Sequence, residues 1–450
     1  MKETLEYKPT ITKEEAAEIL KVSPAALKVF EEKYQKAALD YTKNSNNIFD
    51  RCIKLFKSKN DTSNIDSSVV EQIVTELLSQ TEIEYFGETH ERFAFPDVET
   101  RHLTPEDLNG IPAKERPNLL GDYMEKDING ESYLILLEML KRYQDTGDII
   151  AYHLFRQGLD ILPIDPIIYE MLGMNKNSIG YWMPNLYEAA NKQDFFKIPK
   201  TWILKVPITL LQVTRLEYES LSAITKKIIN EFCMRAFQLD PQKEYFVKTG
   251  TYSSKFNFQN AHVKGAQEVL ELGEYLTFIQ NQAVIAAGPL TQPSIYGLST
   301  TNEWCVREYI SDVESNPCIY YGMPLHTEYR LFFDGDTKEI LGITPYWKPD
   351  IMKKRFEKGE NPNEIHDYAI YAAHEKTLMD RYNTNKDAVL NAVEILIKNL
   401  DLPGQWSLDI MQNGTDFYLI DMACACNSAL KDCCKGKLKE TKEDWIPKLC

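Results

Sequence analysis

Apolar residues recur with helical spacing in the first half of the chain, whereas strand-like runs alternate with helices in the second half. Helical periodicity covers residues 69–78 and 133–140. Later runs predict strands at 245–247, 304–310, 329–333, 340–345, 406–411 and 417–422. The helices expected among them cover about 214–237, 265–285, 365–379 and 386–400. This alternation predicts an α+β fold.

Local signals near the N-terminus indicate how the chain is divided. Thr12 with Glu15 forms a capping box, and Ser23 followed by Pro24 supplies an N-cap and a proline at the first helical position. The stretch 57–68 is nearly without apolar residues and predicts an exposed linker. We therefore expect a small helical segment (1–60), a helix-rich region for a substrate or partner (69–196) and a C-terminal α+β domain (197–450).

Composition and charge narrow the class of protein. The chain has 450 residues, more than one hydrophobic core usually serves, and 43% of them are hydrophobic and 26% charged, as in soluble globular proteins. The formal net charge of -16 would repel a phosphate backbone, which argues against nucleic acid as a partner. No apolar stretch approaches the roughly 20 residues that span a bilayer. We expect a cytoplasmic protein that contacts no membrane.

Nine cysteines in a chain of this length indicate reduced thiols and not a disulfide framework. Four of them, Cys424, Cys426, Cys433 and Cys434, lie close together in the sequence. Their spacing lacks the paired C-x-x-C arms of a zinc ribbon, so buried or redox-idle thiols are favoured over a metal site.

A short apolar strand followed by a small polar loop forms the first candidate binding element. Lys248 ends the strand and Lys255 follows the loop, so both can supply positive charge to phosphate. Gly250, Ser253 and Ser254 allow backbone N–H groups to approach phosphate oxygens closely. The same residues are also compatible with a surface loop that carries two solvated lysines.

Two late apolar strands each contain one acidic residue, Asp409 and Asp421, and are joined through Asn413–Gly414. Mg²⁺ is a natural partner for two carboxylates that would be costly to bury alone. A loop of three or five residues places the aspartates on one face, whereas a two-residue loop places them on opposite faces. We expect the longer loop; alternatively, each aspartate pairs with a lysine or caps a turn.

Between these two elements, the run beginning at His326 predicts a hairpin that turns at residues 334–336. Glu328 and Arg330 project from one face of its first strand. Arg330 can neutralise a terminal phosphate, and Glu328 can orient that phosphate or a substrate. The two residues are also compatible with a surface ion pair.

The order of Lys248 and Lys255, then Trp304-Cys-Val-Arg-Glu-Tyr-Ile, then Glu328-x-Arg330, then Asp409 and Leu-Ile-Asp421 resembles the ATP-grasp superfamily. Within it, the layout is most similar to the cell-division-cycle assembly factors of eukaryotic translation initiation. The resemblance covers roughly residues 197–435. It implies an ATP-grasp fold, two α+β lobes clasping Mg-ATP, preceded by a mostly helical N-terminal region.

The resemblance also implies roles for single residues. Lys248 and Lys255 would contact the ATP phosphates, and Arg330 would face the γ-phosphate. Glu308 would reach the ribose. The backbone that reads adenine would be that of Arg307, Glu308, Tyr309 and Ile310. Mg²⁺ would be held by Asp409 and Asp421.

One departure from the family pattern concerns the metal. The family commonly places an asparagine two residues after the second acidic residue, where this chain has Ala423, and Asn427 is a possible substitute. The loss of that ligand would weaken a second metal site and affects catalysis more than ATP binding.

Three functions are compatible with such a site. The first is an ATP-dependent carboxylate–amine ligase that proceeds through an acyl phosphate, with an unidentified carboxylate or amine substrate. The alternative is a non-catalytic ATP-binding assembly factor or regulator of a partner protein. A phosphotransferase is a third and less favoured possibility.

Overall fold

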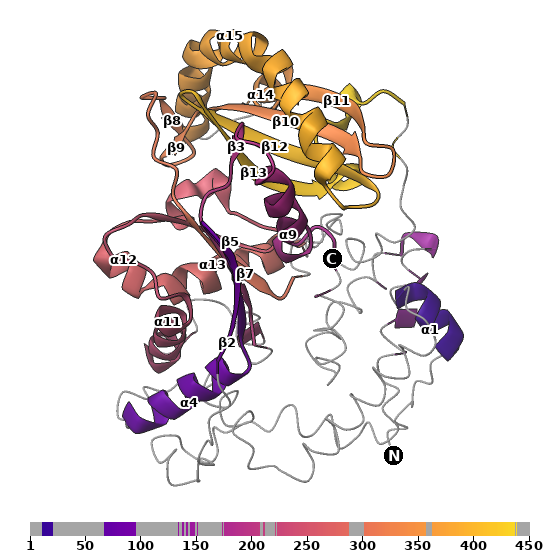
Figure 1. The fold of residues 1–450 in the computed structure, drawn as a ribbon. Helices are drawn as coiled ribbons and strands as arrows, with labels where there is room; N and C mark the ends of the chain where they lie inside the picture. The colour runs from indigo at the N-terminus through magenta and orange to yellow at the C-terminus, as the bar shows by residue number, and fades with distance from the viewer. Residues whose placement is uncertain are drawn as a thin grey trace.

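Two large β-sheets organise the part of the chain that the computed structural model describes. The described residues are 11–20, 67–95, 175–207, 223–287, 301–356 and 362–436, together with a few isolated positions between them. Figure 1 shows the two sheets one above the other, with helices packed against each. The expected α+β fold is confirmed in these residues.

The first sheet has six strands in the order β2-β1-β4-β7-β5-β6, and every neighbouring pair is antiparallel. The strands are β1 (Glu82–Phe86), β2 (His90–Ala94), β4 (Thr201–Lys205), β5 (Tyr245–Thr249), β6 (His262–Val263) and β7 (Glu303–Glu308). The helices beside it are α4 (Ser67–Ser79), α11 (Ala223–Phe237), α12 (Ala266–Leu270) and α13 (Leu272–Ala287). Apolar side chains of both layers form one core, which fixes the positions of β5 and β7.

The second sheet has five strands in the order β11-β10-β12-β13-β3, with β3 parallel to β13 and the other pairs antiparallel. Its strands are β3 (Phe196–Lys197), β10 (Thr327–Asp334), β11 (Glu339–Pro345), β12 (Gln405–Asn413) and β13 (Asp416–Cys424). Helices α9 (Ile179–Ala190) and α15 (Pro362–Asn399) share a core with this sheet. Ile203 of β4 and Cys305 of β7 also belong to that core, so it ties the two sheets together.

A smaller unit connects the two sheets at one side. It contains the two-stranded sheet of β8 (Cys318–Ile319) and β9 (Met323–Pro324), the helix α14 (Pro349–Phe356) and part of α15. Phe258 of the 3₁₀ segment η4 (Lys255–Asn260) packs into its apolar cluster. The segment that follows β5 in the first sheet is therefore held against elements next to the second sheet.

Two sequence expectations differ from the structure. The helices expected at 365–379 and 386–400 form one continuous helix, α15, because the polar residues between them include no glycine or proline and Tyr382 is buried against the core. In the described part of the region 69–196, the strands β1 and β2 were not expected beside the helices α4 and α9, and β1 pairs with β4 across the expected boundary near residue 197.

The N-terminal expectations are only partly covered by the described residues. Helix α1 (Lys13–Leu20) begins at the expected capping box, since the Thr12 N–H donates to Glu15 and the Glu15 N–H donates to Thr12 Oγ1 at 3.2 Å. The Ser23–Pro24 signal lies outside the described residues, as do most of the linker 57–68 and of the helix 133–140. None of the described helices is long and apolar enough to cross a membrane.

Candidate functional site

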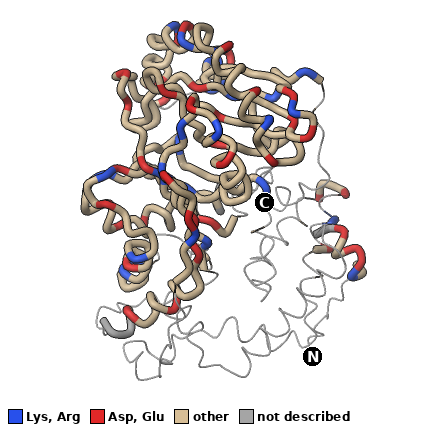
Figure 2. The backbone as a smooth tube through the Cα atoms, viewed as in Figure 1, with Lys and Arg blue, Asp and Glu red and all other residues tan. Residues whose placement is uncertain are grey.

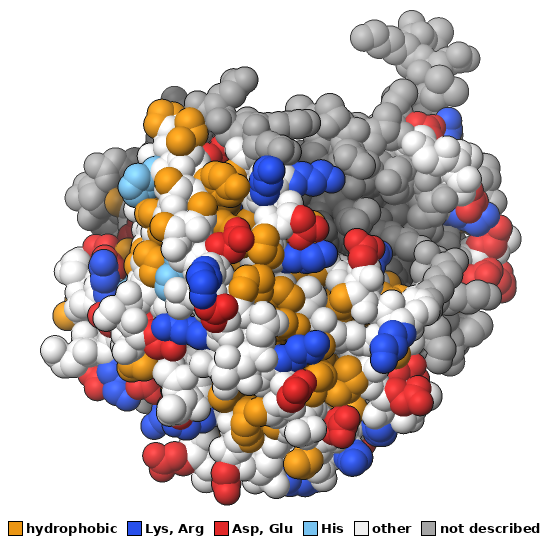
Figure 3. All heavy atoms as spheres, turned by 90° about the horizontal axis from the view of Figure 1, so that it is seen from above, with side chains coloured by type: hydrophobic (Ala, Val, Ile, Leu, Met, Phe, Trp, Pro, Cys, Tyr) orange, Lys and Arg blue, Asp and Glu red, His pale blue; other side chains and the backbone are white. Residues whose placement is uncertain are grey.

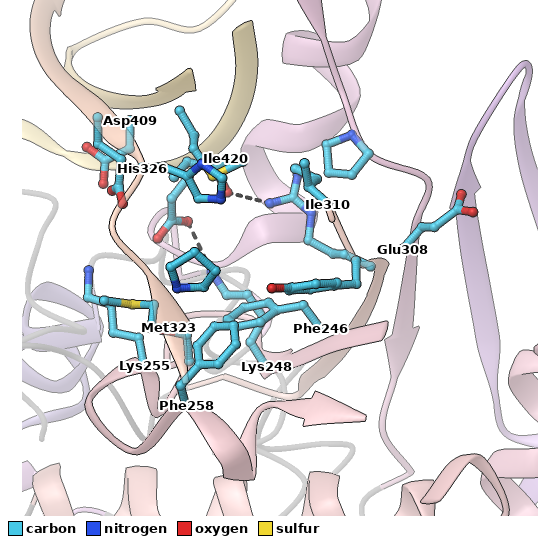
Figure 4. Close-up of a pocket in the computed structure, with 18 of the residues that line it drawn as sticks. Phe246, Lys248, Lys255, Phe258, Glu308, Ile310, Met323, His326, Asp409 and Ile420 are labelled. Carbon is cyan, nitrogen blue, oxygen red and sulfur yellow. Dashed lines mark hydrogen bonds and ion pairs between the residues drawn. The ribbon is translucent and has the colours of Figure 1, made fainter. Parts of the chain in front are cut away.

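A pocket lies between the two large sheets, where β5 and β7 face β10, β12 and β13 (Figure 4). Sequence-predicted residues from four separate segments line it: Lys248, Ser253, Lys255, Arg307, Glu308, Tyr309, Ile310, Glu328, Asp409 and Asp421. The early basic loop and the late acidic hairpin therefore meet at one cleft, although Lys248 and Asp421 are 173 residues apart in the sequence.

The two aspartates stand directly opposite each other on β12 and β13, so their side chains share one face of the sheet. The expected proximity is correct, but the expected loop of three or five residues is wrong. The turn has only two residues, Gly414 and Thr415, since Asn413 pairs with Asp416. A β-bulge at Ile420 then shifts the register by one residue, which brings Asp421 opposite Asp409.

Each aspartate is bound by a basic side chain. Lys248 Nζ lies 3.0 Å from Asp421 Oδ1, and Arg330 binds Asp409 through two parallel bonds of 2.7 and 2.6 Å. The Lys248 side chain is only 3% exposed, whereas that of Asp421 is 44% exposed. Asp409 and Arg330 face each other across β12 and β10. The alternative in which each aspartate pairs with a lysine is therefore met by Asp421, whereas Asp409 pairs with an arginine.

Lys255 and Glu328 are two further ionisable residues in the pocket lining. Lys255 Nζ contacts the Tyr346 hydroxyl and lies 4.4 Å from the centroid of the Tyr346 ring. Burial opposes the Lys255 cation, but Tyr346, Glu328 and Asp409 outweigh this and raise its pKa. Burial raises the pKa of Glu328 to about 7, although Trp347 Nε1 donates to its carboxylate at 3.2 Å. Lys255 therefore stays charged in a poorly solvated part of the cleft, whereas the Glu328 carboxyl keeps its proton up to about pH 7.

The loop after β5 has a fixed backbone. The Thr249 N–H donates to the Tyr252 carbonyl, the Tyr252 N–H donates to Thr249 Oγ1, and the Gly250 N–H donates to the Glu303 carbonyl. The N–H groups of Ser253 and Ser254 donate to no other described residue. Ser254 is buried and adopts a left-handed conformation, with φ of 46°. The Gly250 N–H is therefore not available to phosphate, contrary to the expectation, and of the two adjacent serines only Ser253 lines the pocket, so phosphate binding by this loop stays a prediction.

The resemblance implies that the backbone of all four residues 307–310 reads adenine, but these residues differ in the hydrogen bonds that they already make. Arg307 is 5% exposed and donates to Thr201 Oγ1 and to the Leu419 and Ile420 carbonyls, so it ties β7 to the bulge of β13. The N–H groups of Glu308 and Tyr309 donate to Lys200 and Glu244. Only Ile310, within this stretch, has a backbone N–H and carbonyl that bond to no other described residue.

The Glu308 carboxylate binds Lys243 at 2.7 Å and points away from the other labelled side chains in Figure 4. In this arrangement it is held away from the centre of the pocket. A ribose contact through Glu308 thus stays a prediction, and it would require the Lys243 pair to open.

The donor chemistry at the hairpin suits a hard cation such as Mg²⁺, because two carboxylates share one face and Asp421 is half-exposed. Asn427, in the 3₁₀ turn η5 (Ala425–Asn427), does not line the pocket, although its buried Nδ2 lacks a hydrogen-bond partner. Ala423 offers no side-chain ligand. Asp409 and Asp421 therefore fit one ion, and the third ligand that the resemblance implies is not assembled with them.

Several lining residues carried no sequence signal. Trp347, Met323 and Phe258 come from segments without polar motifs and give the pocket an apolar end. Tyr346 has the Lys255 Nζ and the Arg330 guanidinium, at 4.7 Å, against its ring. His326 is buried, which lowers its pKa and keeps the ring neutral. Only its position two residues before Glu328, on alternate strand positions, could have indicated that it faces the same side.

Charge is mixed over the described surface. Figure 2 shows acidic and basic positions interspersed along both sheets, and the face in Figure 3 shows Lys and Arg side chains beside Asp and Glu. Pairs such as Lys197–Asp416 and Arg235–Glu71 lie within 2.6 and 2.7 Å.

Comparisons with known proteins add little. No family model matches the chain, and no curated protein matches it by sequence. Among solved structures it is similar to Cdc123 from Schizosaccharomyces pombe, with 15% identity and a TM-score of 0.31 over 56% of this chain and 84% of that chain. The C-terminally truncated form of the same protein is 14% identical, with a TM-score of 0.31, over 55% of this chain and 83% of that chain. At this TM-score the likeness carries no structural argument, and membership of the ATP-grasp superfamily stays a prediction.

Proposed function

We propose that this protein binds Mg-ATP in the pocket between its two large sheets and uses the bound nucleotide to stabilise one arrangement that a partner protein recognises. The supporting observation is the convergence of Lys248 and Lys255 with Asp409 and Asp421 around one cleft, while Arg330, outside the pocket lining, binds Asp409. Basic groups for a triphosphate and carboxylates for its metal ion are thus within reach of one ligand, and an apolar end is available for the base.

The ion pairs of the cleft suggest how binding would proceed. In this structure, Lys248 neutralises Asp421 and Arg330 neutralises Asp409. When Mg-ATP binds, the aspartates would face the metal ion and Lys248 would face phosphate, so each charge exchanges one partner for another. Mg²⁺ would supply charge neutralisation for the phosphates. Because neither partner is left buried and alone, the exchange avoids the large cost of an unpaired charge.

Asp421 is the residue best placed to change partners. Its second carboxylate oxygen accepts no hydrogen bond from a described residue, and the side chain is 44% exposed. Asp409 is held by both of its oxygens, and its side chain is 7% exposed. We therefore expect Asp421 to govern the metal dependence of binding, while Asp409 mainly keeps Arg330 in place.

A non-catalytic role is favoured by the incomplete metal-ligand set. Ala423 replaces the asparagine that the family pattern places there, and Asn427 lies outside the pocket lining. Catalysis of phosphoryl transfer relies on charge neutralisation at the transferred group, commonly by metal ions. A site with two carboxylates, one of them tied to Arg330, suits binding better than turnover.

A carboxylate–amine ligase remains the second candidate because of one observation. Glu328 lies in the cleft near Lys255, and burial raises its pKa to about 7, a value suited to accepting a proton from an attacking amine. In that case Glu328 would act as the general base, and Arg330 would stabilise the charge of an acyl phosphate.

Two measurements on the full chain test the proposal. Calorimetric titration with ATP should show binding that is much tighter with Mg²⁺ than with a chelator, and Asp421→Asn should reduce that difference. Incubation with Mg-ATP and pooled amino acids, peptides and organic acids should then release no ADP above background. Equal binding with and without Mg²⁺ would contradict the exchange of partners, and ADP release that depends on one acceptor would favour the ligase.

A further inference from the structure

A second polar cluster adjoins the pocket, with His326 in the pocket lining and its carboxylates in the connector that follows β7. Asp312 and Glu314 belong to this connector, and His326 immediately precedes β10. One ligand atom from each of the three lies within 4.8 Å of the others. The side chains of Asp312, Glu314 and His326 are 14%, 10% and 5% exposed, so the cluster is much less accessible to solvent than a surface patch.

The side-chain amide of Asn316 occupies the centre of this cluster. Its Nδ2 lies 2.9 Å from Asp312 Oδ1, 3.3 Å from Glu314 Oε2 and 3.3 Å from His326 Nδ1. An amide nitrogen has two hydrogens and three acceptors surround it here, so one acceptor lacks a full hydrogen bond. Three convergent acceptors around one donor are the arrangement that a small cation would satisfy completely.

An independent observation comes from α15. His374 lies two turns before Arg381 on that helix; burial and Arg381 lower its pKa, against the opposing effect of the Glu314 and Asp312 carboxylates. Its buried Nε2 has no hydrogen-bond partner among the described residues, and a metal-bound water would supply one.

The cluster carries a net negative charge. Arg381 Nη1 donates to Glu314 Oε2 at 3.2 Å and to Asn316 Oδ1 at 2.9 Å, which balances one of the two carboxylates. Glu314 Oε1 accepts no hydrogen bond from a described residue and can bind an ion while Arg381 stays in place. The Asp312 carboxylate is oriented by the backbone N–H groups of Glu314 and Asn316.

The geometry points to a binding site for one divalent transition-metal ion, held by Asp312, Glu314 and His326 Nδ1, with the Asn316 side-chain amide displaced when the ion binds. One imidazole and two carboxylates suit ions such as Mn²⁺ or Zn²⁺ and leave positions for water. The ion would fasten the connector after Ile310 to the start of β10 and to α15. The site shares His326 with the pocket lining, but its carboxylates are different from Asp409 and Asp421, and the proposal does not depend on nucleotide binding.

The test uses the full chain, stripped of metal with a chelator and titrated with Mn²⁺ without nucleotide. Mn²⁺ is chosen because it prefers oxygen and nitrogen over the thiols of this protein. Electron paramagnetic resonance of unbound Mn²⁺ should show one tight equivalent per chain. Glu314→Gln and Asp312→Asn, neither of which lines the pocket, should each weaken this binding at least ~10-fold.

Two controls keep the outcomes distinct. His262→Gln removes the histidine of another His–carboxylate pair, with Glu244 at 2.8 Å, and should leave Mn²⁺ binding unchanged. Asp421→Asn should also retain the tight equivalent, because it alters only the proposed nucleotide site. Unchanged thermal unfolding of the metal-free variants would show that they fold. Absence of a tight equivalent, or equal affinity in Glu314→Gln and the native protein, would overturn the assignment.

Discussion

Two buried ionic clusters flank the same pocket, and they are built differently. In the cleft cluster, Asp409 and Asp421 each form an ion pair with a basic side chain from another strand. In the connector cluster, Asp312 and Glu314 are held mainly by backbone N–H groups, an amide and a single arginine. The first arrangement can exchange partners with a ligand, whereas the second is fixed in place and keeps an excess of negative charge.

This difference predicts that the cleft cluster is more sensitive to the loss of a cation. Arg330→Met should lower the free energy of unfolding by about 3–5 kcal/mol, because it leaves the Asp409 carboxylate buried without a partner. Urea denaturation measures this. Arg381→Met, at the connector cluster, should cost less, about 1–3 kcal/mol, since Arg381 is 27% exposed and makes one bond to Glu314.

Lys376→Met, in an exposed pair with Asp380, serves as the control and should cost under about 1 kcal/mol. If Arg330→Met were no more destabilising than this control, the cleft cluster would not be a buried ion-pair system, and the contrast between the two clusters would disappear.

Lys248→Ala tests the difference between the two clusters through the affinity for Mg-ATP. It removes the cation that we expect to pass from Asp421 to phosphate, and it should weaken Mg-ATP binding by at least about 2 kcal/mol, or roughly 30-fold. Isothermal titration calorimetry provides the affinity, with Lys376→Ala as a matched lysine replacement far from the pocket lining. An unchanged affinity would remove Lys248 from the site.

Glu328 provides a test through pH. Its pKa is raised to about 7, so between about pH 4.5 and 7 the native state holds a proton that the unfolded chain releases. The stability from this proton is present at low pH and is lost as the pH rises through about 7. Glu328→Gln should therefore be more stable than the native protein at pH 8, by on the order of 1–3 kcal/mol, with a smaller difference at pH 5.5.

Urea unfolding at both pH values measures this difference. Glu339→Gln, at an exposed position on β11, is the control and should not alter the pH dependence. A pH dependence that is the same in Glu328→Gln and the native protein would mean that Glu328 is solvated like an ordinary surface carboxylate.

The smallest effect concerns the turn that aligns the acidic hairpin. Gly414 has a φ of +67°, and a Cβ there would lie 3.1 Å from Val313 Cγ2. Gly414→Ala should cost about 1–2 kcal/mol of folding free energy through the left-handed backbone alone. Thermal unfolding measures the cost, and Thr415→Ala in the same turn should have little effect. Equal stability of the two variants would contradict the assigned turn.

Sequence patterns predicted the chemistry of the cleft better than its geometry. Alternation along the strands placed Glu328 and Arg330 on one face, and the acidic residues in apolar runs marked Asp409 and Asp421. The bulge at Ile420 has no signature in the sequence, because its extra residue is an ordinary apolar one. The correct neighbours were therefore predicted from a wrong loop length.

Other features could not be predicted from local sequence patterns, because residues from distant segments form them together. The pairing of β1 with β4 depends on tertiary contact and not on periodicity within residues 69–196. Tyr346 and Trp347 enter the site only because β11 lies beside β10. The connector cluster joins residues from the segment after β7, the start of β10 and α15, each of which reads alone as an ordinary polar position.

The most direct test is a crystal structure of the full chain with a non-hydrolysable ATP analogue and Mn²⁺, in which anomalous scattering locates the metal. We predict phosphate oxygens next to Lys248 and Lys255, a metal ion between the phosphates and the Asp409–Asp421 pair, and a separated Lys248–Asp421 ion pair. A nucleotide bound elsewhere, or an intact Lys248–Asp421 pair under saturating nucleotide, would contradict the proposed function.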